Sequence, residues 1–244
     1  MTREGPADGR ARGTSGRWGV RVVTRRADLS VSGLTVDLGS GPSRARPLEN
    51  LSFTGGDGRL VVVCAPSGRG KTTLLSVLAG LLIPTQGSIN FAGRELALSS
   101  RREMLQHRRD CVGLVFQSFN LIASLDAVEN VMAPLLMTGV RQSVARRRAA
   151  ELLSGMGLDH RLHHRPGSLS GGEQQRVAIA RGVVGDPPLF LADEPTAHLD
   201  QAQVGAVLTL LRSLVRPGRL VLVATHDARV VQVADDVVDL TAPC

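Results

Sequence analysis

Residues 60–82 read Leu60-Val-Val-Val-Cys64, then Ala65-Pro-Ser-Gly-Arg-Gly-Lys-Thr72, then Thr73-Leu-Leu-Ser-Val-Leu-Ala-Gly-Leu-Leu82. The first five residues form a continuous, largely β-branched apolar run, which predicts a strand buried on both faces. The last ten have the composition of a helix, which Pro84 would end. A buried strand, a glycine-rich loop, Lys-Thr and a helix, in this order, form an arrangement that binds polyphosphate. The stretch therefore predicts an α/β fold with a phosphate site at the end of a strand.

The loop between this strand and helix carries the groups that would hold the phosphates. Backbone N–H groups of residues 68–72 would point at the anion, at a helix N-terminus whose partial positive charge favours it. Lys71 would reach the β- and γ-phosphates, and Thr72 would offer its hydroxyl to Mg²⁺. The consensus begins with Gly where this chain has Ala65, which would cost about 1 kcal/mol if the position required positive φ. The loop residues assigned to nucleotide binding are Ala65, Pro66, Ser67, Gly68, Arg69, Gly70, Lys71, Thr72 and Thr73.

The loop contains the only lysine of the chain. Of the 29 basic residues, all except Lys71 are arginines. Arginine is a broad planar fork and lysine a slender point charge, so the two are not interchangeable. Retention of one lysine in so arginine-rich a chain indicates a site at position 71 where arginine would not fit.

The sequence on both sides continues the alternation of strands and helices. Short apolar runs predict three further buried strands, at residues 111–116, 189–192 and 220–224. Helical periodicity covers residues 126–156, 170–184 and 203–215. Short runs between residues 29 and 53 instead predict antiparallel strands. The alternation implies a parallel sheet with its ligands beyond the carboxyl ends of the strands, where Gln117, Asp193, Glu194 and His226 stand.

Two adjacent carboxylates follow the strand at 189–192. Of Asp193 and Glu194, one can hold Mg²⁺ while the other accepts a proton from an attacking water. Alone, such a pair would more often be a solvated strand end. Downstream of a phosphate loop, it indicates a catalytic role.

The composition is that of a globular protein without a membrane span. Apolar residues make up 43% of the 244 residues and charged residues 21%, and no stretch approaches the roughly 18 apolar residues that cross a bilayer. Residues 1–28 are rich in Gly and Arg without the apolar centre of a secretion signal, and predict a flexible basic extension.

Cys64, Cys111 and Cys244 show no metal-binding spacing, so we expect reduced thiols in the cytoplasm. The net charge of +7 alone assigns no partner.

A highly specific signature lies at Leu169-Ser-Gly-Gly-Glu-Gln-Gln-Arg176. Ser-Gly-Gly ahead of a helix predicts a second anion-binding helix start. With the phosphate loop and the polar strand ends in the expected order, the chain closely resembles an ATP-binding-cassette (ABC) nucleotide-binding domain over about residues 30–240. The resemblance implies a P-loop NTPase with a RecA-like parallel core, an antiparallel β lobe and an inserted helical subdomain. It places this domain at 29–244, with the helical subdomain at about 118–187.

The resemblance also implies an arrangement and residue roles. Two such domains pack head to tail as a homodimer, and each ATP with its Mg²⁺ lies between the phosphate loop of one and the signature of the other. Asp200 would link the two sites. The implied catalytic residues are Glu194 as general base, His226 as the group holding the γ-phosphate and water, Lys71 and Gln117. The implied nucleotide contacts across the dimer are Ser170, Gly171 and Gly172, and the implied metal contacts are Thr72, Gln117 and Asp193.

The chain departs from the family pattern at two places. The family usually stacks adenine on an aromatic residue where this chain has Leu38, with Val36 nearby. Without that stack, the free energy of nucleotide binding would be less favourable by about 1 kcal/mol. His198 also stands at a position where another residue is commoner, which we interpret as neutral variation.

Within the family, residues 126–136 and the stretch from Gly157 to Pro166 resemble the lipoprotein-release, macrolide-export and cell-division group. In that group the cassette is commonly a separate chain that pairs with a membrane permease, so we expect it on the inner face of the membrane, powering export or substrate extraction. Residues 118–137 would receive the permease's coupling helix. Apolar Phe119, Leu121 and Leu125 fit that role, and fit the core of the helical subdomain equally well.

Two other functions remain open from the sequence. A non-transport ABC ATPase would act on nucleic acid or ribosomes, but such relatives generally carry two cassettes or long insertions, and neither is present here. No nucleic acid is therefore expected as partner. A degenerate cassette would bind ATP only structurally, which the departures at Ala65 and Leu38 motivate.

Overall fold

The computed structural model describes residues 26–39, 44–96, 100–197 and 199–240. Most of the extension expected at 1–28 lies outside these ranges, as do His198 and Cys244. No helix in the described ranges is both long and apolar enough to cross a bilayer.

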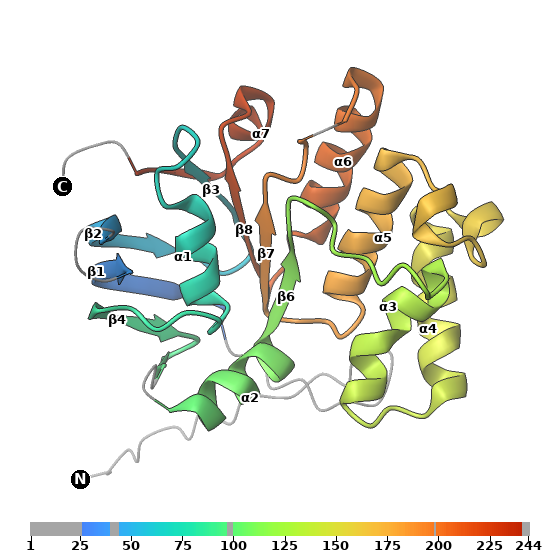
Figure 1. Cartoon of the computed structure of the whole chain (residues 1–244), viewed down its shortest axis with the longest axis horizontal. Coiled ribbons are helices and arrows are strands. Elements are labelled where there is room, and N and C mark those ends of the chain that lie inside the picture. Colours follow the sequence, from blue (N-terminus) through green and yellow to red (C-terminus); the bar gives the residue numbers. More distant parts are fainter. Residues whose placement is uncertain (1–25, 40–43, 97–99, 198, 241–244) are drawn as a thin grey trace, which may run out of the picture.

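A parallel five-stranded sheet forms the centre of the molecule (Figure 1). Its order is β6-β7-β8-β3-β9. Its strands are β3 (Leu60–Cys64), β6 (Val112–Val115), β7 (Leu189–Asp193), β8 (Leu220–Thr225) and β9 (Asp236–Asp239). The strands expected at 60–64, 189–192 and 220–224 are confirmed, each to within a residue. The strand expected to begin at Cys111 begins one residue later, because Cys111 is the last residue of helix α2 (Arg101–Cys111).

The alternation of side chains along β3 explains why its whole run is apolar. Val61 and Val63 face a core shared with helix α1 (Lys71–Leu78), whereas Leu60 and Val62 face a second core with α5 (Gly171–Val183) and α6 (Gln201–Leu214). All four are fully buried. The strand is thus covered on both faces, as its sequence predicts.

A second, antiparallel sheet lies against α1, on the opposite side of the molecule from α5 and α6 (Figure 1). Its order is β2-β1-β4-β5. Its strands are β1 (Leu29–Leu38), β2 (Ala45–Gly55), β4 (Gln86–Phe91) and β5 (Arg94–Glu95). The antiparallel strands expected between residues 29 and 53 are confirmed.

The helices differ from the sequence-based expectation at two places. Helix α1 begins at Lys71 and ends at Leu78, earlier than Pro84 would require. The single helical stretch expected at 126–156 is two helices, α3 (Ala127–Met137) and α4 (Gln142–Gly155). Gly139 lies between them with φ +82°, a left-handed conformation that ends the first helix.

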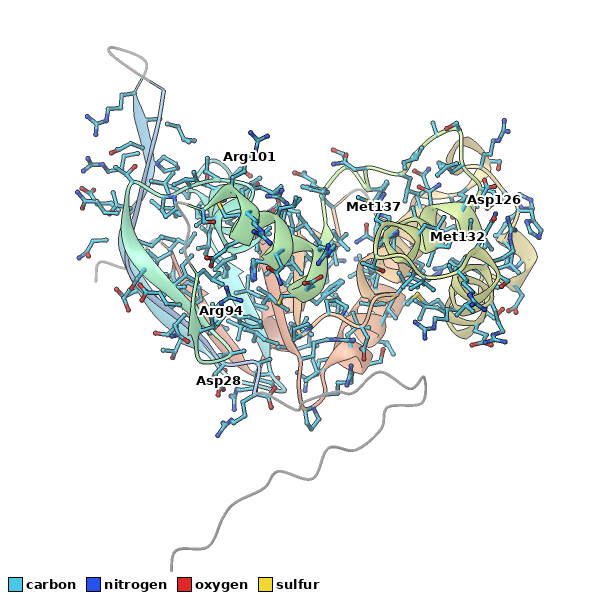
Figure 2. The ribbon with its side chains drawn as sticks, turned by 90° about the horizontal axis from the view of Figure 1, so that it is seen from below. Asp28, Arg94, Arg101, Asp126, Met132 and Met137 are labelled. Atoms are coloured by element: carbon cyan, nitrogen blue, oxygen red, sulfur yellow. The ribbon has the colours of Figure 1, made fainter. Side chains whose placement is uncertain are left out.

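Helices α3, α4 and α5 enclose a third apolar core, lined by Val131, Leu135, Leu153 and Val177 among others. Two single 3₁₀ turns, Asp159–Arg161 and Pro166–Ser168, connect α4 to α5. The short helix α7 (Ala228–Gln232) follows β8. Figure 2 shows α3 running from Asp126 past Met132 to Met137, with its far end on the side of α2.

The contact between β6 and α5 yields a test of the packing. A Cβ at Gly113 would lie 2.0 Å from the carbonyl oxygen of Gly182, backbone against backbone. We expect Gly113→Ala to lower the free energy of unfolding by about 3 kcal/mol in a denaturant titration, since neither backbone can yield cheaply.

A matched control is available on α6. Gly205 is exposed, and a Cβ there meets nothing within 4 Å. Gly205→Ala should raise the stability by up to about 1 kcal/mol, because alanine favours a helix interior over glycine. Equal stabilities of the two variants would contradict the packing described.

Candidate functional site

The polar residues at the ends of the parallel strands meet at one edge of the sheet. The register pairs Cys64 with Thr225 and Asp193 with Ala224, so the phosphate loop, Glu194 and His226 all follow at the same level. Gln117 belongs to this edge too, because Val115 pairs with Ala192. Its side chain is exposed.

Lys71 lies at the centre of this group with its side chain only 6% exposed. Its Nζ donates to the carbonyl oxygens of Ala65 and Pro66, at 2.6 and 3.0 Å. The same Nζ lies 3.2 Å from Oε1 of Glu194. The ammonium is thus held over the loop by oxygen atoms alone. The oxygen atoms of an incoming anion can bind it in the same way.

Glu194 is held by donors from three directions. Thr225 Oγ1 donates to its Oε2 at 2.8 Å, and His226 Nδ1 lies 2.7 Å from its Oε1. Burial alone would raise the pKa of Glu194, but the hydrogen bonds from His226, Thr225 and Lys71 outweigh burial and lower it. The residue also has φ +45°, a costly conformation for a side chain other than glycine. The carboxylate is therefore kept ionised and in one orientation.

Asp193 next to it has one oxygen in use and one without a partner. Thr72 Oγ1 donates to Oδ2 at 2.6 Å, whereas Oδ1 is buried with no hydrogen-bond partner among the described residues. Burial raises the pKa of Asp193. An unsatisfied carboxylate oxygen beside a threonine hydroxyl is a donor set that suits Mg²⁺, which is commonly bound through few protein ligands plus phosphates.

In the glycine-rich loop the structure answers the question raised at Ala65 and adds a packing reason for glycine at position 70. Ala65 does not have positive φ, so the strain considered for it is not present. Gly70 has φ +84°, and a Cβ there would lie 2.3 Å from the carbonyl oxygen of Pro47 in β2. The close approach of the antiparallel sheet therefore requires glycine at position 70. This requirement holds in addition to any that a bound phosphate would make. Nothing lies within 4 Å of a Cβ at Gly68, which leaves that side of the loop open.

Leu38 ends β1 and is 37% exposed, whereas Val36 is fully buried in the core. Beside Leu38, the Asp37 carboxylate is held by Arg44 and Arg46, at 2.7 and 2.8 Å. Of the two aliphatic residues considered for the adenine, only Leu38 presents surface.

The signature lies away from this group, on the first turn of α5. Ser170 is the N-cap, and the first hydrogen bond within the helix runs from Gln174 N to Ser170 O. The amides of Gly171 and Gly172 precede that bond and therefore have no acceptor within α5, as is usual at a helix start that binds an anion. In the described ranges no hydrogen bond or ion pair joins residues 170–172 to the phosphate loop. One chain therefore presents two separate helix starts, each of a kind that suits an anion.

Asp200 lies close to the signature rather than to Lys71. It is the N-cap of α6 and accepts a hydrogen bond from Gln203 N at 2.8 Å. The side chain of Gln203 covers Gly172, where a Cβ would meet its Cδ at 2.9 Å. Sequence reasoning missed Gln203, because only the packing of α6 on α5 identifies it.

An open pocket of about 340 Å³ borders Glu194 and His226. Its wall includes Thr196 and Asp227, joined by a 2.8 Å hydrogen bond. The Arg229 guanidinium holds the pKa of Asp227 at about 2, in spite of partial burial. Thr196, Thr225 and Asp227 were also missed, although their positions one or two residues from assigned residues could have indicated them.

The apolar residues proposed for a docking groove mostly face inward. Phe119 and Leu121 are partly buried against the second core. The large apolar side chains that this segment exposes are Ile122, Leu136 and Met137, at 47, 39 and 83%. The core role is therefore the better interpretation of Phe119 and Leu121.

Comparisons with known proteins agree with this geometry. Residues 48–197 match the family model described as ABC transporter. A Mycobacterium tuberculosis protein named an uncharacterized ABC transporter ATP-binding protein is 52% identical over 88% of this chain and 65% of its own length. A macrolide export ATP-binding/permease protein of Hyphomonas neptunium is 39% identical over 87% of this chain and 33% of its own length.

A solved structure agrees with the fold. A dimeric ATP-binding cassette, captured in a post-hydrolysis state bound to ADP and Pi, superposes with a TM-score of 0.80 at 35% identity. The match covers 86% of this chain and 93% of that one. The predicted fold class is confirmed, and a macrolide-export relative agrees with the predicted subgroup. The matched part spans only about two thirds of the mycobacterial relative. This chain belongs to the ABC transporter family and contains its ATP-binding cassette.

Proposed function

We propose that the chain binds and hydrolyses ATP to energise a separate membrane permease, for export or substrate extraction. The observation that carries the proposal is the meeting of Lys71, Thr72, Asp193, Glu194 and His226 at one sheet edge. The cassette dimer bound to ADP and Pi supports hydrolysis, and the macrolide-export relative supports transport.

Each residue at the edge has a task that follows from its contacts. When ATP enters the loop, Lys71 exchanges its bonds to the carbonyls of residues 65 and 66 for the β- and γ-phosphate oxygens. Glu194 is ionised, and it takes a proton from the water that attacks the γ-phosphate. His226 binds Glu194 through Nδ1, and its largely exposed ring holds the γ-phosphate and that water in place.

A bound Mg²⁺ would neutralise the charge that develops on the phosphates. Thr72 Oγ1 and the unpartnered Oδ1 of Asp193 would hold it. Gln117, which is exposed at the same edge two residues after β6, would be a further contact of the metal. Leu38 provides the surface on which the adenine rests.

The second helix start completes the site in a dimer. The signature of one copy, Ser170 with the amides of Gly171 and Gly172, would close over the ATP held by the other copy. Asp200, at the start of the helix that covers Gly172, links the two sites. This arrangement explains why one chain carries two anion-binding helix starts that do not meet.

The permease would dock beside α3, at the inner face of the membrane. Ile122, Leu136 and Met137 are large apolar side chains that this segment exposes, and an exposed apolar group of this kind suits a partner helix.

Purified protein tests the proposal directly. We expect Mg²⁺-dependent release of phosphate from ATP, and capture of a membrane permease from detergent-solubilised membranes of the source cells. Charged substitution of Met137, such as Met137→Glu, should abolish capture and leave the hydrolysis of the isolated chain unchanged. Salt-sensitive binding of RNA or DNA without residues 1–28, and no permease, would favour action on nucleic acid instead.

A further inference from the structure

Arg161 connects the segment before the signature to the signature helix itself. It ends the 3₁₀ turn Asp159–Arg161. Its Nε donates to Oε1 of Glu173 at 2.8 Å. The Glu173 side chain is only 11% exposed and that of Arg161 is 35% exposed, so the pair is partly shielded from water.

The two oxygens of Glu173 have separate tasks. While Oε1 accepts from Arg161, Oε2 accepts from the backbone N–H of Ser170 at 2.7 Å. In return, Ser170 Oγ accepts from Glu173 N at 3.3 Å, which completes a capping box. Because Ser170 Oγ acts here as acceptor, its own hydroxyl hydrogen remains available to donate to an anion.

The charge of Glu173 opposes the task of the helix start. Burial alone would raise its pKa, but hydrogen bonds from Ser170 and Arg161 hold the pKa at about 2, so the carboxylate is ionised at neutral pH. A carboxylate in the first turn stabilises the helix but repels a phosphate that approaches the amides of Gly171 and Gly172. Arg161 is placed to cancel this charge without displacing the cap.

We propose that Arg161 is a positioning residue for the nucleotide: through Glu173 it orients Ser170 and neutralises the carboxylate that the terminal phosphate would otherwise meet. The inference rests on the proposed closure of the signature over ATP bound by a second copy. His160, with Nε2 3.7 Å from the same Oε1 and a 63% exposed side chain, is too distant to replace the guanidinium hydrogen bond.

The test uses the full chain carrying Glu194→Gln, in which ATP should drive stable dimers. We expect Arg161→Met to weaken ATP-driven dimerisation about tenfold in analytical ultracentrifugation, the size expected for one hydrogen bond to a charged group. The affinity of the monomer for ATP should change by less than about twofold, because the side-chain hydrogen bonds of Arg161 in the described ranges are with Glu173 and His164 and none is with the monomer's own phosphate loop.

A matched control lies on α4 of the same subdomain. Arg147 is 61% exposed and forms only a 3.9 Å pair with Glu151. Arg147→Met should therefore dimerise as the parent does. Arg161→Lys, which keeps the charge, should recover most of the dimerisation.

A double substitution separates positioning from simple stability. Glu173→Gln removes the charge and keeps an oxygen that can accept from Ser170 N. Arg161→Met should then add almost no further loss. Additive losses of dimerisation, or an Arg161→Met chain that dimerises like Arg147→Met, would overturn the inference while leaving the proposed function intact. A parent chain that binds no ATP would overturn both.

Discussion

Lys71→Ala is expected to abolish ATP turnover, lowering kcat/KM about a thousandfold or more and nucleotide affinity by at least about a hundredfold. Its ammonium lies 3.2 Å from Oε1 of Glu194, and among the described residues no other lysine or arginine pairs with that carboxylate. In the arginine-rich chain no second lysine can replace it. Isothermal titration with ATP and a phosphate-release assay would measure the two effects.

Two further substitutions in the loop make the test specific. Arg69, two residues away, is exposed, and Arg69→Ala removes a positive charge from the same loop with a loss of affinity below about tenfold. Lys71→Arg keeps the charge, but the planar fork has no room at a position only 6% exposed. We expect that variant to be nearly as impaired as Lys71→Ala. A Lys71→Ala chain that binds and splits ATP like the unaltered protein would refute the assignment of the whole site.

The elements that the sequence predicts well are those whose residues meet one uniform environment. Residues 60–63 and 220–224 are buried on both faces, so every position is apolar and the strand can be predicted without knowledge of its partners. The start of α5 is equally predictable, because Ser170 and Glu173 form a capping box whose Ser-x-x-Glu pattern is present in the sequence.

The elements that could not be predicted have no such local signal. Helix α2 buries only Met104 and His107 and exposes Leu105, so its apolar pattern indicates no face. Strand β9 (Asp236–Asp239) has four residues and owes its existence to pairing with β3. Both depend on tertiary contacts that a linear reading does not contain.

The candidate site shows the same division. Motif spacing predicts the group around Lys71, because parallel strands bring their carboxyl ends to one edge. The positive φ of Glu194, the hydrogen bond from Thr225 and the position of Gln203 on Gly172 arise from packing between distant segments. Spacing also could not reveal that Ala65 avoids positive φ, which removes one of the two reasons for suspecting a degenerate cassette.

The second large effect concerns Glu194, which we expect to be the base. Glu194→Gln should lower kcat by about a hundredfold to ten-thousandfold, the range of a general base. Binding of ATP should survive, since glutamine has the shape of glutamate and fits the same place beside Thr225 and His226. The amide carries no negative charge, so Lys71 loses a competing partner. ATP should therefore bind at least as tightly as to the unaltered chain.

The measurement is single-turnover hydrolysis alongside the fraction of dimer in the presence of ATP. Without the base, ATP is not hydrolysed and stays bound between the two copies. The variant should therefore accumulate ATP-bound dimers that the unaltered chain shows only briefly. Glu151→Gln, on the exposed face of α4, makes the same chemical change away from the site and should leave both quantities as they are. Turnover of Glu194→Gln at the unaltered rate would transfer the role of base to another group. Since Oδ2 of Asp193 already accepts from Thr72 and its Oδ1 is the oxygen proposed to hold Mg²⁺, that group would be His226, whose ring lines the pocket.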